Sequence, residues 1–126
     1  MASTTGTAIG GGIGFDSAGG KGDVTINGGN VYAYNFENRN GIPSAAIGGA
    51  GSNRSAGNIG KVTIRGGNVY AYAVGGTAIG GGSSKLSNGG SAEVEITGGS
   101  IIAISKAGTV SGSNSAGAGI GGGTGG

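Results

Sequence analysis

Residues 24–34 read VTINGGNVYAY, and this strand motif returns as VTIRGGNVYAY at residues 62–72 and, more diverged, as VEITGGSIIAI at residues 94–104. A second motif, the glycine motif, reads AIGGG at residues 8–12 and recurs as AIGGA at 46–50, AIGGG at 78–82 and GIGGG at 119–123. Four glycine motifs therefore bracket three strand motifs. Self-similarity at a period of roughly 20 to 50 residues is typical of architectures in which each repeat stacks on its neighbour.

The spacing between the two motifs is constant. Fifteen positions separate the Ile of a glycine motif from the Val of the next strand motif in all three cases: Ile9 to Val24, Ile47 to Val62 and Ile79 to Val94. Length varies only after the strand motif, where 11, 5 and 14 residues precede the next glycine motif. Stacked strands must stay in register, whereas a loop that leaves the stack tolerates insertions. We therefore expect one loop of variable length per repeat.

The repeats divide the chain without a break in composition. Counted from Ile to Ile they are 38, 32 and 41 residues long. We expect a single domain over residues 1–126, with repeat boundaries near 9–46, 47–78 and 79–119 and a partial repeat at 120–126.

Glycine content and alternation exclude helices and favour strands. The 126 residues include 36 glycines, and glycine in a helix interior costs roughly 1 kcal/mol relative to alanine. In each half of the strand motif alternate positions are apolar, and in its first copy these positions are Val24 and Ile26, then Val31 and Ala33. We place these apolar positions inside. The sequence predicts an all-β solenoid of about three coils of 32–41 residues, with a thin apolar interior.

The glycine pair of each strand motif predicts a corner between two strands, where positive φ or close backbone approach requires the absent Cβ. Asn30, Asn68 and Ser100 follow the pair at the same place in each repeat. Stacked side-chain amides can hydrogen-bond from level to level, so we interpret these three residues as a structural ladder.

Composition argues against several classes of function. Seven Lys/Arg and five Asp/Glu give a net charge of +2, and the basic residues are scattered, which indicates no nucleic-acid partner. The chain contains no His and no Cys, and its carboxylates are dispersed. We therefore expect no catalytic residues, no metal site and no cofactor, hence no enzyme. No apolar run approaches the roughly 18 residues that a membrane-spanning helix needs, so we expect no membrane insertion.

Tyrosines of the strand motif are the best candidates for a binding face. Tyr32, Tyr34, Tyr70 and Tyr72 fall on the outward parity, where they would form two aromatic ladders. Flat aromatic rings can stack on sugars or anchor a protein contact. They can also simply pack on one another and shield the strands. These three interpretations stay open at the level of sequence.

The two motifs together resemble the GAGIGGG and ITINGGTVTA repeats of large secreted and cell-wall-attached proteins, mostly bacterial. The resemblance covers essentially the whole chain and implies a right-handed parallel β-helix, a location outside the cell or at its surface, and a non-catalytic role. Some modules of this kind bind carbohydrate. Here tyrosine replaces the outward threonines of the commoner motif.

The ends of the array suggest how it associates. Four glycine motifs against three strand motifs mean that the chain enters and leaves partway through a coil. Unpaired strand edges at a solenoid end are templates for further strands. We predict a structural repeat module that stacks head to tail on itself or on further repeats, with Ile9 and Ile120 at the end-to-end contact.

Alternative functions remain at this stage. A glycan-binding or adhesion module would use the tyrosine face, with a polysaccharide as its partner. An ice-binding face would need regular hydroxyl rows, but Glu95 interrupts the row of Thr25 and Thr63, and alanines alternate with Thr7 and Thr77. Asn53 begins an Asn-Arg-Ser sequon, a possible glycosylation site in a secretory setting.

Overall fold

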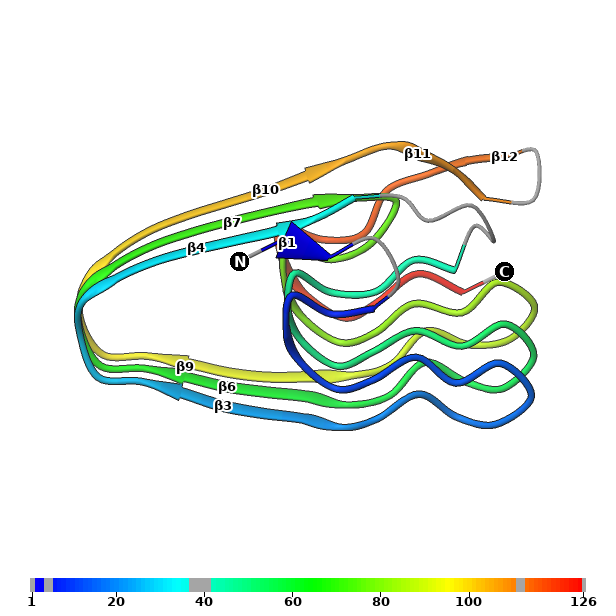
Figure 1. Cartoon of the computed structure of the whole chain (residues 1–126), viewed down its shortest axis with the longest axis horizontal. Helices are drawn as coiled ribbons and strands as arrows, with labels where there is room; N and C mark the ends of the chain where they lie inside the picture. The colour runs from blue at the N-terminus through cyan, green and yellow to red at the C-terminus, as the bar shows by residue number, and fades with distance from the viewer. Residues whose placement is uncertain (1, 4–5, 37–41, 111–112, 126) are drawn as a thin grey trace.

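The computed structural model describes residues 2–3, 6–36, 42–110 and 113–125. Over these residues the chain is all β and contains no helix. Three sheets consist of parallel strands drawn from successive repeats, and a fourth is a two-stranded antiparallel hairpin. Figure 1 shows two of the parallel sheets converging at one corner, with the loops of the glycine motifs closing the opposite side.

Each parallel sheet collects one part of the repeat. The glycine-motif strands are β2 (Ile9–Gly10), β5 (Ile47–Gly48), β8 (Ile79–Gly80) and β13 (Ile120–Gly121). The first halves of the strand motifs form β3 (Gly22–Ile26), β6 (Gly60–Ile64) and β9 (Ala92–Ile96). The second halves form β4 (Asn30–Asn35), β7 (Asn68–Val74) and β10 (Ser100–Lys106), and β1 (Ala2–Ser3) is added beside β4.

The strands pair in the register that the motif spacing predicts. Val24 pairs with Val62 and Val62 with Val94, so these residues lie in one file across the three repeats. The Ile residues of the four glycine motifs pair in the same way, from Ile9 to Ile120. The prediction that equal motif spacing gives an equal strand register is therefore confirmed.

Glycine is required at two places in each repeat. At the corner, Gly67 has a φ of 90°, and a Cβ there would overlap the carbonyl oxygen of Gly29 one level below. The glycine motif adds a position that the sequence did not single out. Gly48 has a φ of 130°, and a Cβ there would overlap the carbonyl oxygen of Gly80 one level above. Both positions therefore exclude side chains through backbone conformation and through close stacking.

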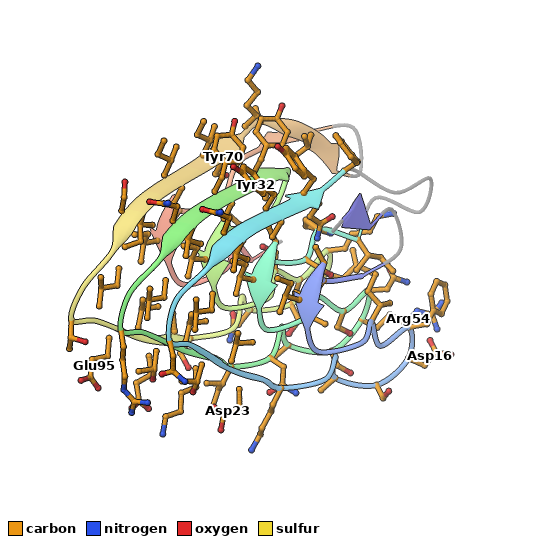
Figure 2. All side chains as sticks on the ribbon, turned by 60° about the vertical axis from the view of Figure 1, so that its left-hand side comes forward. Asp16, Asp23, Tyr32, Arg54, Tyr70 and Glu95 are labelled. Carbon is orange, nitrogen blue, oxygen red and sulfur yellow. The ribbon has the colours of Figure 1, made fainter. Side chains whose placement is uncertain are left out.

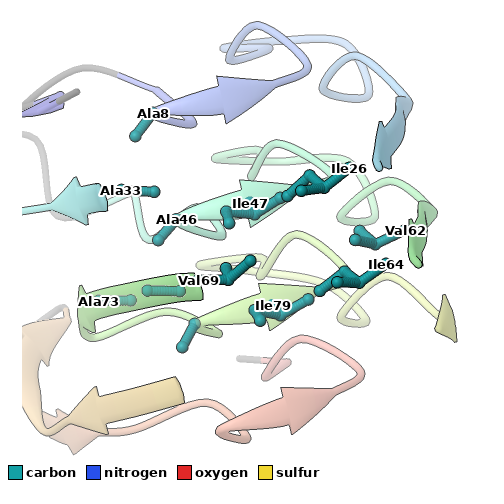
Figure 3. Close-up of a cluster of buried hydrophobic side chains, with 12 residues drawn as sticks. Ala8, Ile26, Ala33, Ala46, Ile47, Val62, Ile64, Val69, Ala73 and Ile79 are labelled. Carbon is teal, nitrogen blue, oxygen red and sulfur yellow. The ribbon is translucent and has the colours of Figure 1, made fainter. Parts of the chain in front are cut away.

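The apolar parity of the strand motif faces the interior, as predicted (Figure 3). In the middle repeat Val62 and Ile64 are fully buried. In the last repeat their counterpart Val94 is half-buried and Ile96 is 42% exposed. β9 is the edge strand of its sheet on this side, which leaves both side chains more exposed, whereas Ile26 on the opposite edge strand β3 stays buried.

Polar side chains in the interior were not anticipated. Ser52 is fully buried; its hydroxyl donates to the Ser17 carbonyl at 2.8 Å and accepts from the Ser55 amide at 3.1 Å. Ser84 occupies the same place in the next repeat and donates to the Ser55 carbonyl at 2.8 Å. These hydroxyls tie the turns of adjacent repeats together. The recurrence of serine three positions apart was the available signal.

One hydroxyl row considered for the surface lies inside. Thr77 and Ala45 are fully buried, and the Thr77 hydroxyl donates to the Gly122 carbonyl at 3.1 Å. The Thr77 hydroxyl therefore links two repeats and is not part of a flat external face.

The longest of the variable loops contains its own secondary structure. After β10 the chain forms β11 (Gly108–Val110) and β12 (Ser113–Ser115), which pair antiparallel. Figure 1 shows this hairpin beyond the end of β10, outside the stacked sheets. The insertion thus extends one loop and leaves the register of the repeats unchanged.

Candidate functional site

The four tyrosines lie together on the outer face of β4 and β7, and Figure 2 shows Tyr32 and Tyr70 there. Tyr32 is in register with Tyr70, and their ring centroids are 6.5 Å apart. Tyr34 is in register with Tyr72, at 6.3 Å. Tyr34 also lies 5.6 Å from Tyr70, so the two ladders merge into one cluster. All these pairs are tilted, a favourable arrangement for aromatic rings.

Phe36 extends this cluster and was missed by the sequence reasoning. Its ring stacks on Tyr34 at 6.3 Å with an interplanar angle of 9°, and it lies 6.4 Å from Tyr72. Phe36 follows Tyr32 and Tyr34 at the same parity, which was a usable signal, but it falls in the loop of variable length. The cluster therefore ends in an aromatic residue that only the first repeat carries.

A shallow hollow of about 250 Å³ borders the cluster on the β10 side. Its lining residues are Tyr32, Asn68, Val69, Tyr70, Ser100 and Ile102. Tyr32 and Ile102 are both more than half exposed, at 55% and 51%. Ile102, one of the lining residues, occupies the position that tyrosine holds in the two earlier repeats. The hollow combines apolar ring surface with the polar side chains of Asn68 and Ser100.

The proposed side-chain ladder runs along the corner beside this hollow. The Asn68 amide nitrogen donates to the Asn30 side-chain oxygen at 2.9 Å. Ser100 lies in register with Asn68, and its backbone amide donates to the Gly67 carbonyl at 2.9 Å. The Asn68–Asn30 hydrogen bond joins two levels of the stack, so these two residues have a structural role.

Charged residues form one column on the opposite sheet. Asp23 pairs in register with Lys61, and Lys61 pairs with Glu93. The Lys61 ammonium lies 3.9 Å from a Glu93 carboxylate oxygen, and both side chains are more than half exposed. A second exposed ion pair joins Arg54 to Asp16 at 3.3 Å (Figure 2). Signs alternate along the column, which favours this register.

In the described part of the chain both ends of the stack present strand edges, and neither end is flat. Ile120 is 45% exposed on the edge strand β13, and Ile9 on the opposite edge is half-buried. The glycine-motif sheet has four strands, whereas the sheet of β3, β6 and β9 has three. Docking Ile120 of one copy on Ile9 of the next would therefore leave one empty strand position between β9 and the β3 of that next copy. The Ile9–Ile120 contact alone does not continue all three sheets.

At the end of the stack formed by the first repeat, the short strand β1 lies beside β4. Ala2 and Ser3 pair with Tyr34 and Asn35, so they cover the second half of the β4 edge. The buried side chain of Asn35 reinforces this region, because its amide donates to the carbonyls of Gly6, Ser44 and Ala45 at 2.9–3.0 Å. The first half of β4 and the whole of β3 remain at the edge.

The remaining predicted site is peripheral. Asn53 is half-buried in the turn beside the Arg54–Asp16 pair, and its backbone amide donates to the Gly14 carbonyl at 3.3 Å. Among the described residues no three His, Cys, Asp or Glu side chains are grouped to hold a metal ion. Over the same part of the chain no helix is long and apolar enough to cross a membrane.

Comparisons with protein-family models, with curated proteins and with solved structures find no match for this chain. Its geometry and the resemblance of its motifs are therefore the grounds on which a function can be proposed.

Proposed function

We propose that this chain is a non-enzymatic structural repeat module of an extracellular or cell-surface protein. In this proposal it is a section of a right-handed parallel β-helix, a β-solenoid, and its open ends accept further repeats. The constant register across the repeats supports the solenoid. The right hand is supported by the general preference of crossovers between parallel strands in one sheet. The cell-surface setting rests on the resemblance of the motifs.

The observation that carries the proposal is the conformation of Gly121. Its φ of 146° matches the 130–139° of Gly10, Gly48 and Gly80. At those three glycines a Cβ would overlap the carbonyl oxygen of the next level, whereas at Gly121 it would meet only the Ala118 Cβ, at 3.2 Å. The last strand thus has the backbone conformation that allows close stacking at the other levels. A further repeat stacked on β13 would account for this conformation.

An added repeat tests the module directly. A variant carrying a second copy of residues 47–78 between residues 78 and 79 preserves every register contact. Because repeat proteins gain stability from each added interface, we expect a higher free energy of unfolding and unchanged β circular dichroism. A variant that loses its structure, or gains no stability, would contradict the solenoid.

Association of whole copies is measured separately. Light scattering and negative-stain microscopy at rising concentration would detect end-to-end growth. A chain that stays monomeric at every concentration restricts the module to repeats within one polypeptide.

The tyrosine cluster supports a second candidate, a glycan-binding face. The favouring observation is the hollow in which the Tyr32 and Tyr70 rings adjoin the polar side chains of Asn68 and Ser100. Sugar rings offer an apolar face for stacking and hydroxyls for hydrogen bonds. A glycan array should then show binding that Tyr32→Ala and Tyr70→Ala abolish. Phe15→Ala, which removes an exposed aromatic ring between β2 and β3, should preserve it.

A further inference from the structure

We propose that the tyrosine cluster is a site of oxidative cross-linking, at which a carbon–carbon bond joins the rings of Tyr34 and Tyr70. The product is a dityrosine that ties the first repeat to the second. The reagent is a one-electron oxidant of the peroxidase class, with hydrogen peroxide as its co-substrate. The inference goes beyond the proposed function and depends only on the geometry of the cluster.

Composition directs such an oxidant to the cluster. Trp, Cys and Met side chains compete with tyrosine for oxidants, and the sequence contains no Trp, no Cys and a single Met. All four tyrosines of the chain belong to the cluster. Tyr32 is 55% exposed and the other three are half-buried, so a small oxidant reaches these rings from solvent. Oxidation of the chain is therefore concentrated on one outer face.

The rings lean across the strands so that one diagonal of the cluster is short. Tyr34 is in register with Tyr72, and Tyr70 with Tyr32. The ring centroids of Tyr34 and Tyr70 are nevertheless only 5.6 Å apart, closer than the 6.3 Å and 6.5 Å of the two in-register pairs. A lean that shortens this diagonal lengthens the opposite one, from Tyr32 to Tyr72. The fold therefore favours one diagonal pair over the other.

Proximity decides which two rings couple. Phenoxyl radicals join through the ring carbons next to the phenolic oxygen, so two rings must stay within reach of each other. Rotation about χ1 and χ2 of half-buried side chains supplies the final approach of a pair already in contact. Two groups held together in one molecule react as if at a concentration far above that of separate molecules. Coupling within the chain should therefore prevail over coupling between copies.

The reaction balances with peroxide as the only consumed reagent. The peroxidase removes one electron and one proton from each phenol, and hydrogen peroxide takes up both electrons and both protons to become two water molecules. The two phenoxyl radicals then form one carbon–carbon bond. The hydrogen on each joined carbon moves to the phenolic oxygen of its own ring, which restores both aromatic rings and both hydroxyls.

The test treats dilute, folded protein with a heme peroxidase and hydrogen peroxide. Blue dityrosine fluorescence reports coupling, and mass spectrometry after trypsin digestion locates it. Trypsin cuts after Lys and Arg, so Tyr34 falls in the peptide of residues 22–39 and Tyr70 in that of residues 66–85. From monomeric protein we expect a linked pair of these peptides, lighter by two hydrogen atoms than their sum.

Two double variants with equal tyrosine content test the geometry. Tyr32→Phe with Tyr72→Phe keeps the short diagonal, whereas Tyr34→Phe with Tyr70→Phe keeps the long one, and all four rings remain in both. The two remaining tyrosines are 36 positions apart in the first variant and 40 in the second, so their unfolded chains should couple almost equally. In the folded state the first should give at least about tenfold more linked peptide. In urea this difference should disappear.

Three outcomes would overturn the site: no linked peptide in monomeric protein, linkage between copies only, or equal coupling of the two folded double variants. Circular dichroism shows that both variants keep the β structure, so that equal coupling cannot be assigned to unfolding. The variant with an inserted repeat is measured by unfolding without any oxidant. Failure of cross-linking therefore leaves the structural module untouched, and failure of the module leaves the cross-link to be judged by its own measurements.

Discussion

Ile120 pairs in register with Ile79, yet Ile79 is fully buried and Ile120 is 45% exposed. The two side chains occupy the same position of the repeat and differ only in what lies above them. Burial in this fold is therefore set by the number of neighbouring repeats as much as by the identity of the residue.

This pair of residues gives a direct test of stacking. Ile79→Ala should lower the free energy of unfolding by about 2–5 kcal/mol, because it leaves a cavity between two levels. Ile120→Ala should lower it by less than about 1 kcal/mol, since the side chain is already half in solvent. Urea unfolding of both variants measures the difference. Equal losses would show that the contribution of this position to stability does not follow its burial between levels.

The glycine motif should tolerate no side chain where levels touch. Gly48→Ala forces a Cβ into the Gly80 carbonyl at positive φ, so we expect a loss of more than about 3 kcal/mol or an unfolded chain. Gly28→Ala is the control, because a Cβ there has open space; its effect should stay within about 0.5 kcal/mol. Thermal and urea denaturation compare the two. A stable Gly48→Ala variant would contradict the close approach.

The charge column should respond to reversal of its central residue. Lys61→Glu places three like charges in register, and we expect a loss of about 1 kcal/mol that shrinks as salt is added. Arg65→Glu changes the net charge equally but faces Asn27 and Thr97. Its effect should be smaller and less dependent on salt. Urea unfolding at low and high ionic strength separates the two variants.

The buried serines should contribute more than exposed ones. Ser52→Ala removes a hydroxyl that makes two hydrogen bonds in the interior, and we expect a loss of about 1–3 kcal/mol. Ser55→Ala removes a hydroxyl whose exposed contact with the Asp16 carbonyl is 3.4 Å long, and it should lose less than about 0.5 kcal/mol. A reversed order in urea unfolding would show that the turns are not tied through Ser52.

Much of the fold could be predicted because comparing the repeats shows which spacings and residue types stay constant. The constant interval from Ile to Val predicted the register, since strands one repeat apart must align to pair. Alternation identified Val62 and Ile64 as interior. The burial of Thr77 and Ser52 escaped prediction, because a short polar residue in a glycine-rich stretch carries no periodicity that separates an inward hydroxyl from a solvated one.

For the candidate sites, the sequence predicted on which face the residues lie but not how their side chains contact one another. Sequence parity placed Tyr32, Tyr34, Tyr70 and Tyr72 on one outer face, but the contact of Tyr34 with Tyr70 depends on how side chains lean across strands. Phe36 joined the cluster because β4 continues to Asn35 before the variable loop begins. The hollow beside Tyr32 is lined by residues of β4, β7 and β10 together, and only the stacking of these strands brings them side by side.

By itself the sequence determined the repeat, its register, the inward parity and the glycine corner, because each is fixed by local chemistry repeated at constant spacing. Only the tertiary structure decided which equivalent residues are buried, how the aromatic rings meet, and that the ends are stepped. Those features depend on contacts between levels and on how many strands each sheet receives, and neither is encoded in any single repeat.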